Sequence, residues 1–313
     1  MKKGFAVVVA SGPGKVEDAR FGDLVDSVRC FEPTECVGIV MIDDGDRDSR
    51  FLETLPPYPP VFRIRNPRKG RGNAWTGGHT VGIVAGYSFV DAHLDPEYML
   101  KLDSDALVIA PFHSALSERF RADGRIGLLG AHLHRDFPSQ SGSAEYWGRQ
   151  IRKSSNPLSI TRQPGLEIRL NLGPAGGKLR FLLRQAYKSG YSLGESCQGG
   201  AYALRAEALH SMRTLGMFAP PLRFLGLQLT EDILFSLAVR AAGFELRDLN
   251  DSGEVFGVAW KGLLASPAEL LRQGRSIIHS VKSSEGLDEK NIRHYFREER
   301  ARTNAIRDVP YSD

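Results

Sequence analysis

The hydrophobic residues of the first 130 positions fall into short runs separated by stretches with helical spacing. The short runs are mostly β-branched and are bounded by Gly, Pro or Asp, which predicts strands at residues 5–10, 35–42, 61–64, 98–102 and 126–130. Apolar positions between them recur with the helical period and predict helices at residues 21–30, 49–55 and 73–92. Strands that alternate with helices in this way predict a mixed, mainly parallel α/β sheet with helices on both faces.

The pattern changes after residue 131. The segment 132–177 is rich in Ser, Gly, Arg and Pro and predicts no regular element, and irregular segments of that length are usually functional or disordered. Regular structure is predicted again in the remainder, as helices at residues 178–188 and 206–215, a strand at 200–204, a helix that opens at Thr230 and a charged helical tail around 289–302.

An acidic tip follows the predicted strand 98–102. Asp103 and Asp105 are separated by one residue, so on extended chain their carboxylates project to the same side. Two anions held that close repel each other unless a cation lies between them. Mg²⁺ or Mn²⁺ suits oxygen ligands and leaves positions for phosphate oxygens. The alternative is a solvated turn between two strands.

Two other loops lie where ligands of parallel sheets bind, at the carboxyl ends of strands. Asp43 and Asp44 follow the second predicted strand and can accept hydrogen bonds from a ribose or a base, although an acidic turn would look the same. The loop 65–72 carries four cations and two glycines just before the helix predicted at Asn73. Such a loop favours phosphate binding over an exposed basic loop or a nucleic-acid patch, for which interleaved aromatics are lacking.

Three later motifs each have a structural and a functional interpretation. Gly199 and Gly200 at the start of a strand indicate a ligand close to the backbone, or a tight turn. Glu231 and Asp232 follow Thr230, an N-cap residue, and acids are common in a first helical turn, yet a carboxylate fixed there could also act as a general base. His279 in a late apolar stretch is either structural or a third metal ligand.

Composition narrows the classes of protein. The 313 residues are 42% hydrophobic and 25% charged, as in globular proteins with a large core. A net charge of +4 suits an anionic ligand but is too small to indicate nucleic acid. The three cysteines contain no C-x-x-C pair, which argues against a disulfide framework or structural zinc and favours the cytoplasm. No apolar stretch reaches about 18 residues, so no integral membrane segment is expected.

Over residues 4–285 the order of these motifs resembles a nucleotide-sugar-dependent glycosyltransferase of the GT-A fold, and its pattern is most similar to family 2. The order is an apolar first strand, D-D-G-D, the basic loop, D-S-D, Q-G-G-x-Y-A-L, T-E-D and a late His. Two features depart from the family pattern, because D-D-G-D replaces the commoner N-D-G-S turn and Ser11-Gly12-Pro13 is an unusual loop. The resemblance implies a nucleotide-sugar-binding half at residues 1–130, an acceptor-binding and catalytic half of the same domain at 131–285, and a helical tail at 286–313.

The resemblance also implies roles for the matching residues. Asp103, Asp105 and His279 would hold Mn²⁺ or Mg²⁺, and Asp232, with Glu231 beside it, would be the general base. The expected contacts to the nucleotide sugar are Ala10, Ser11, Asp43, Asp44, Arg68, Arg71, Asn73, Asp103, Ser104, Gly199 and Gly200.

The implied reaction moves a sugar from a nucleoside-diphosphate sugar, with a UDP-sugar expected, to a hydroxyl of a glycan or small-molecule acceptor, with inversion. A retaining enzyme in which Asp232 orients substrate is one alternative. A second is a nucleotidyltransferase, whose usual Gly-rich, Arg-containing first loop and later Pro-Lys are poorly matched here. A third is a catalytically silent binder of nucleotide sugars or glycans. No nucleic-acid partner is expected, and a homodimer is left open.

Overall fold

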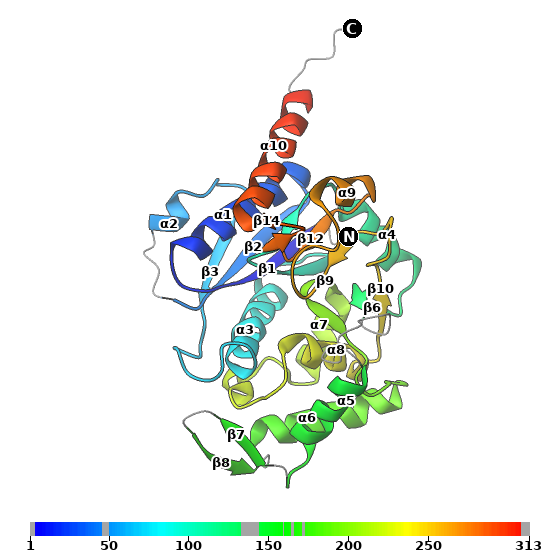
Figure 1. Cartoon of the computed structure of the whole chain (residues 1–313). Coiled ribbons are helices and arrows are strands. Elements are labelled where there is room, and N and C mark those ends of the chain that lie inside the picture. Colours follow the sequence, from blue (N-terminus) through cyan, green and yellow to red (C-terminus); the bar gives the residue numbers. More distant parts are fainter. Residues whose placement is uncertain are drawn as a thin grey trace.

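The computed structural model describes residues 4–45, 50–132, 144–158, 160–163, 166–170 and 173–307. A seven-stranded sheet runs through the middle of the molecule in the order β10-β6-β9-β4-β1-β2-β3 (Figure 1). Its strands are β1 (Phe5–Ser11), β2 (Cys36–Asp43), β3 (Val61–Arg65), β4 (Tyr98–Asp103), β6 (Ile126–His132), β9 (Cys197–Arg205) and β10 (Glu245–Asp248). Only β9 runs antiparallel to its neighbours, so the mixed, mainly parallel α/β prediction is confirmed.

Helices cover both faces of this sheet. Their bounds are α1 (Lys15–Phe31), α2 (Arg50–Glu53), α3 (Gly77–His93), α4 (His113–Ala122), α5 (Ala144–Ser155), α6 (Pro174–Lys188), α7 (Ala206–Thr214), α8 (Glu231–Ala241), α9 (Pro267–Arg272) and α10 (Glu289–Arg307), with a 3₁₀ turn η2 (Pro221–Phe224). Successive residues of β1 face opposite sides, so Val8 joins the core under α3 and α8, while Val7 and Val9 join the core under α1 and α4.

Short strands complete the structure outside the large sheet. β5 (Leu107–Val108), β11 (Phe256–Val258) and β12 (Ile277–His279) form a three-stranded sheet, in which β12 pairs with both of the others. Two hairpins consist of β7 (Ile160–Gln163) with β8 (Leu166–Leu170), and of β13 (Ser283–Ser284) with β14 (Leu287–Asp288). Within the residues described, no helix has the length and apolar character needed to cross a membrane.

Two predictions of secondary structure are wrong. The segment 132–177 contains α5 and the β7–β8 hairpin, while residues 133–143, 159, 164–165 and 171–172 lie outside the described part. The helix predicted from Asn73 begins at Gly77, because the Asn73 side chain accepts a hydrogen bond from the Trp75 backbone amide and forms a turn there.

The predicted tail is a helix, α10, that is anchored to α1 by one buried acid. The Asp23 carboxylate accepts hydrogen bonds from Arg293, at 2.8 Å, from Arg297, at 3.0 Å, and from Arg300. Burial alone would raise the pKa of Asp23, but the three guanidinium groups outweigh it and lower that pKa. The carboxylate therefore stays charged at neutral pH and joins the two helices. Residues 308–313 of the predicted tail lie outside the described part.

We expect Asp23→Ala to lower the free energy of unfolding by about 3–5 kcal/mol, because it leaves the buried Arg300 without a counter-charge and removes one of the two carboxylates that pair with Arg293. Since the pKa of Asp23 is lower in the folded state, its contribution is present above the ordinary aspartate pKa and is lost as the pH falls below it. Urea unfolding from neutral to acid pH measures both effects. Asp26→Ala, an exposed acid on the same helix, is the control and should change stability by less than about 0.5 kcal/mol. Equal losses in the two variants would contradict the anchoring role.

Candidate functional site

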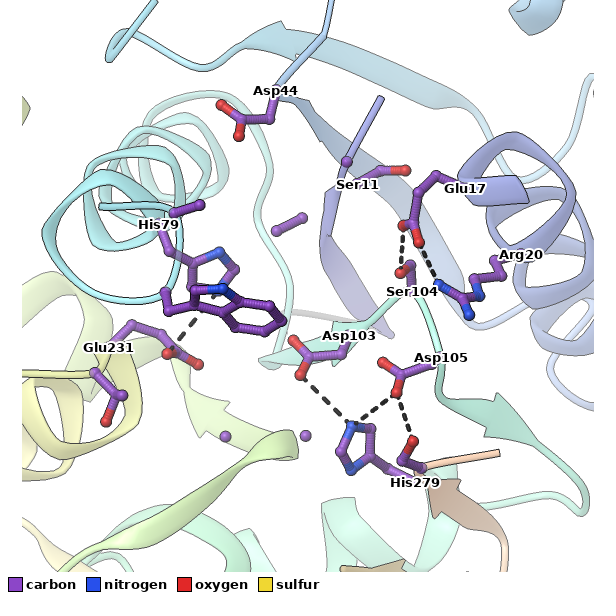
Figure 2. Close-up of a pocket in the computed structure, with 18 of the residues that line it drawn as sticks. Ser11, Glu17, Arg20, Asp44, His79, Asp103, Ser104, Asp105, Glu231 and His279 are labelled. Atoms are coloured by element: carbon purple, nitrogen blue, oxygen red, sulfur yellow. Dashed lines mark hydrogen bonds and ion pairs between the residues drawn. The ribbon is translucent and has the colours of Figure 1, made fainter. Parts of the chain in front are cut away.

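A cavity of about 910 Å³ lies at the carboxyl ends of β1, β2 and β4 (Figure 2). The starts of β9 and α8 form another part of its wall, together with the segments that follow β11 and β12. The residues predicted from sequence that line it are Ala10, Ser11, Asp44, Arg68, Asp103, Ser104, Asp105, Gly199, Gly200, Glu231, Asp232 and His279. The fold therefore brings residues from positions 10 to 279 to one cavity, as expected for an α/β sheet of this kind.

Asp43 is not on the cavity wall, contrary to expectation. Its buried carboxylate accepts hydrogen bonds from Arg63, with Oδ2 at 2.9 Å from Nε and 2.6 Å from Nη2, and Oδ1 lies 3.0 Å from the Gly45 amide. These contacts hold the end of β2 against β3. A direct contact of Asp43 with a nucleoside is therefore not supported by its position.

The basic loop also differs from the prediction, because its polar groups bind one another. Arg68 Nε donates to Asp44 Oδ1 at 2.6 Å, and Arg68 Nη1 donates to the carbonyl oxygens of Arg71 and Gly72 at 3.2 and 3.3 Å. The Arg71 side chain in turn donates to the Arg68 carbonyl oxygen. Arg71 and Asn73 are absent from the cavity wall, and only Arg68 of the four cations lines it. The loop is thus a folded turn, with Arg68 already neutralised by Asp44.

Three ligand atoms suited to a divalent cation meet at the tip of β4. His279 Nε2 lies 3.6 Å from Asp103 Oδ2 and 3.5 Å from Asp105 Oδ2, and Figure 2 shows all three side chains pointing toward one another. His279 Nδ1 lies 2.9 Å from the Ala259 carbonyl oxygen. Because a carbonyl can only accept, Nδ1 donates this hydrogen bond, and Nε2 is the nitrogen that would bind a metal ion once it has no proton. Two carboxylate oxygens and one imidazole nitrogen fit Mn²⁺ or Mg²⁺.

The glycine pair at the start of β9 is required by close packing against these groups. A Cβ at Gly200 would collide with the His279 ring, and a Cβ at Gly199 would lie 2.7 Å from Glu231 Oε1. Both glycines are therefore required by protein side chains, and the predicted contact with a ligand at this position stays a prediction.

Gly200→Ala should weaken Mn²⁺ binding by about 10–100-fold, because the added methyl group displaces His279 from the two aspartates. Isothermal titration with Mn²⁺ measures the change. Gly22→Ala is the matched control, since a Cβ there meets nothing within 4 Å. Unchanged affinity in the Gly200 variant would show that His279 does not contribute to metal binding.

Lys101 connects the metal group to Glu231 of α8, although its role was not predicted from the sequence. The side chain is fully buried, and Nζ lies 2.6 Å from Asp103 Oδ1 and 2.8 Å from Glu231 Oε1 and also donates to the Gly199 carbonyl oxygen. Burial alone would lower its pKa, but Asp103 and Glu231 outweigh it and raise that pKa. The available signal was a single lysine inside an apolar strand, where charged residues occur only when paired.

Glu231 and Asp232 are adjacent, but their pKa values are shifted in opposite directions. Burial opposes ionisation of Glu231, but Lys101 outweighs it and lowers the pKa of Glu231. For Asp232, burial and then the Glu231 charge raise the pKa, and Oδ1 accepts a hydrogen bond from the Ile233 amide at 2.9 Å. Thr230 occupies the N-cap of α8 without a side-chain capping bond to the helix residues described. A role in capping the helix therefore does not fully explain why Glu231 and Asp232 are here. The raised pKa of Asp232 is the property expected of a group that takes up a proton near neutral pH.

Further lining residues were not singled out from the sequence. Trp75 and Trp260 are 78% and 57% exposed, and such rings offer stacking surfaces to a base or a sugar. Lys282 Nζ lies 2.9 Å from Asp105 Oδ2, which places a cation beside the metal group. Gln198 is only 8% exposed, and its Oε1 has no hydrogen-bond partner within the described part of the chain. A buried unpaired amide oxygen on a cavity wall is suited to a ligand hydroxyl.

No protein-family model and no curated protein matches this chain. Among solved structures, it is similar to the galactosyltransferase LgtC in complex with donor and acceptor sugar analogs, with 13% identity over 95% of each chain and a TM-score of 0.45. It is also similar to the mannosyltransferase PcManGT from Pyrobaculum calidifontis in complex with GDP-Man and Mn²⁺. That match has 14% identity and a TM-score of 0.44, and it covers 98% of this chain and 65% of that chain. The chain is also similar to the bifunctional glycosyltransferase WbbM, with 13% identity over 96% of this chain and a TM-score of 0.47. The chain spans half of the WbbM chain, and none of these comparisons supports the narrower assignment to family 2.

Proposed function

We propose that this chain is a metal-dependent glycosyltransferase of the GT-A type, which takes a sugar from a nucleoside-diphosphate sugar in the cavity at the ends of β1, β2 and β4. One observation carries the proposal. Asp103, Asp105 and His279 Nε2 converge on one side of the cavity, and Asp232, with a raised pKa, lies on its wall beside Gly199. Glycosyl transfer from a diphosphate needs both a cationic site for the leaving group and a carboxylate near the sugar.

In this proposal Asp103, Asp105 and His279 hold Mn²⁺ or Mg²⁺, and the ion offsets the negative charge of the departing diphosphate. Lys282 lies beside this group and adds positive charge on the same side. Ala10, Ser11 and Asp44 line the cavity at the ends of β1 and β2, where a nucleoside would bind, with uridine as the expected base. Gln198, Gly199 and Gly200 line the cavity and are proposed to border the sugar.

Asp232 is proposed to receive the proton of the acceptor hydroxyl. Lys101 keeps Glu231 charged, and that charge raises the pKa of Asp232. The expected inversion finds no support in the comparisons. The retaining alternative therefore stands beside it, with Asp232 orienting the substrate, and the anomer of the product, measured by NMR, separates the two. The acceptor is a glycan or a small molecule with a free hydroxyl.

A thermal-shift screen of nucleotide sugars with and without Mn²⁺ tests the binding step, because a ligand that binds only the folded state raises the melting temperature. Release of nucleotide from the best donor tests catalysis. The proposal expects a shift and slow donor hydrolysis that both require Mn²⁺. A shift without hydrolysis or transfer would instead identify a catalytically silent binder, and the absence of any shift would reject the proposal.

A further inference from the structure

The end of the molecule formed by α5, α6 and the β7–β8 hairpin carries an excess of positive charge. Figure 1 shows these elements together at the bottom of the view, at the opposite end from α10. Residues 144–188 contain nine Lys and Arg but only two Asp and Glu, and the remaining chain contains 32 basic and 35 acidic residues. The net charge of +4 of the whole chain is therefore due to this end alone.

The charges lie on the outward sides of two packed helices. α6 buries Leu179, Leu182 and Leu183 and exposes Arg184 and Lys188. α5 buries Ile151, exposes Arg149, Arg152 and Lys153, and is joined to α6 by a hydrogen bond of 3.1 Å from Arg180 Nη1 to the Ser155 carbonyl oxygen. We call the exposed residues Arg149, Arg152, Lys153, Arg184 and Lys188 the basic face.

Much of this charge is uncompensated. Arg152, Arg184 and Lys188 form no ion pair with any residue that the structure describes, and Arg149 has only Glu145, a surface partner four residues earlier. Surface ion pairs of that kind contribute little to stability, so the Arg149 guanidinium can exchange its partner for another anion. Arg152, Arg184 and Lys188 can therefore bind anions without first breaking an ion pair with a described residue.

Exposed apolar side chains accompany the cations. Phe181 is 37% exposed between Arg180 and Arg184, Tyr187 is 51% exposed next to Lys188, and Leu158 is 78% exposed just after α5. Basic residues mixed with exposed aromatic and aliphatic side chains are typical of surfaces that lie on membranes, where cations meet lipid phosphates and apolar groups enter the headgroup region. A nucleic acid would gain little from Leu158, which offers no ring for stacking.

We propose that the basic face of α5 and α6 docks on an anionic membrane surface. α6 packs against α8, and the first turn of α8 carries Glu231 and Asp232 on the cavity wall. Docking would therefore place the side of the cavity that carries Asp232 toward the lipid, with α6 between α8 and the membrane surface. The binding itself is independent of the proposed glycosyl transfer and is tested without any substrate.

Co-sedimentation with vesicles of phosphatidylcholine alone, or of phosphatidylcholine mixed with phosphatidylglycerol, tests the proposal at low and high salt. We expect binding only to the mixed vesicles, and loss of binding at high salt because surface charges are screened. Arg184→Gln/Lys188→Gln should weaken binding by about 30-fold, since each basic residue near an anionic surface accounts for about fivefold. The matched control Arg29→Gln/Lys290→Gln removes the same charge from exposed positions on α1 and α10.

The control should bind the mixed vesicles as the unmodified protein does. Equal weakening in both variants would attribute binding to net charge and overturn the proposal, as would binding to pure phosphatidylcholine that is insensitive to salt. If the protein does not sediment with mixed vesicles at low salt, the proposal is overturned. Tight binding of heparin or single-stranded DNA that the Arg184/Lys188 variant loses would then assign the basic face to another polyanion.

Discussion

Asp105→Asn is expected to lower Mn²⁺-dependent donor turnover by about 100- to 1000-fold. The substitution keeps the shape of the side chain but removes one of two carboxylates that face His279 Nε2. Burial alone would raise the pKa of Asp105, but His279, Ser280 and Lys282 hold that pKa well below its ordinary value, so the group is charged at every pH of interest. Loss of one charge-stabilising group at a reacting centre typically costs this much in rate.

Donor hydrolysis and transfer as functions of Mn²⁺ concentration measure the effect. Asp26→Asn on the exposed side of α1 is the control and should behave as the unmodified protein does. Because Asp105 also accepts a hydrogen bond of 2.6 Å from Ser280, thermal unfolding of both variants shows whether the fold is kept. A folded Asp105 variant with unchanged dependence on Mn²⁺ would remove Asp105 from the metal site and with it the main support for the proposed function.

The large sheet could be predicted because its strands are buried on both faces. β1, β2 and β4 are continuous apolar runs that end in polar loops, so their type and approximate bounds follow from local sequence. The helix α5 could not be predicted in the same way. It has few apolar residues, and its packing depends on a distant contact in which Gly148 lies against Leu193. Its helical structure is therefore stabilised by tertiary contacts that the local pattern does not show.

The site was predictable where chemistry follows directly from a strand end. The aspartates after β4 lie on the cavity wall for that reason, and the resemblance supplied His279, which reaches them from the other end of the chain. Arg68 lines the cavity as predicted, but Arg71 and Asn73 do not, and the pairing of Arg68 with Asp44, which is 24 residues away, could not be read from the local sequence. Lys101 was overlooked because its partner Glu231 is 130 residues away. The domain division, the cytoplasmic location and the homodimer remain predictions.

Asp232→Asn should leave Mn²⁺ and donor binding unchanged and lower transfer to the acceptor by about 100- to 10,000-fold, the usual range for loss of a general base. Transfer should fall because only an ionised carboxylate at this position can take up the proton of the acceptor hydroxyl, and an amide cannot. Burial and Glu231 raise the pKa of Asp232. Transfer by the unmodified protein should therefore begin to fall, as the pH is lowered, at a pH well above about 4, which is the ordinary aspartate pKa. The Asn variant should lack this decline.

Glu231→Gln is the informative companion variant. It retains Asp232 but removes the negative charge that raises its pKa, so the acid limb of the pH–rate profile should move to lower pH. Initial rates of transfer across the pH range, measured at saturating donor, distinguish the three proteins. If the Asp232 variant keeps its transfer rate and its acid limb, Asp232 is not the base. If the product keeps the anomeric configuration of the donor, Asp232 is assigned to substrate orientation, because deprotonation of the acceptor by a base on the opposite face belongs to a single attack with inversion.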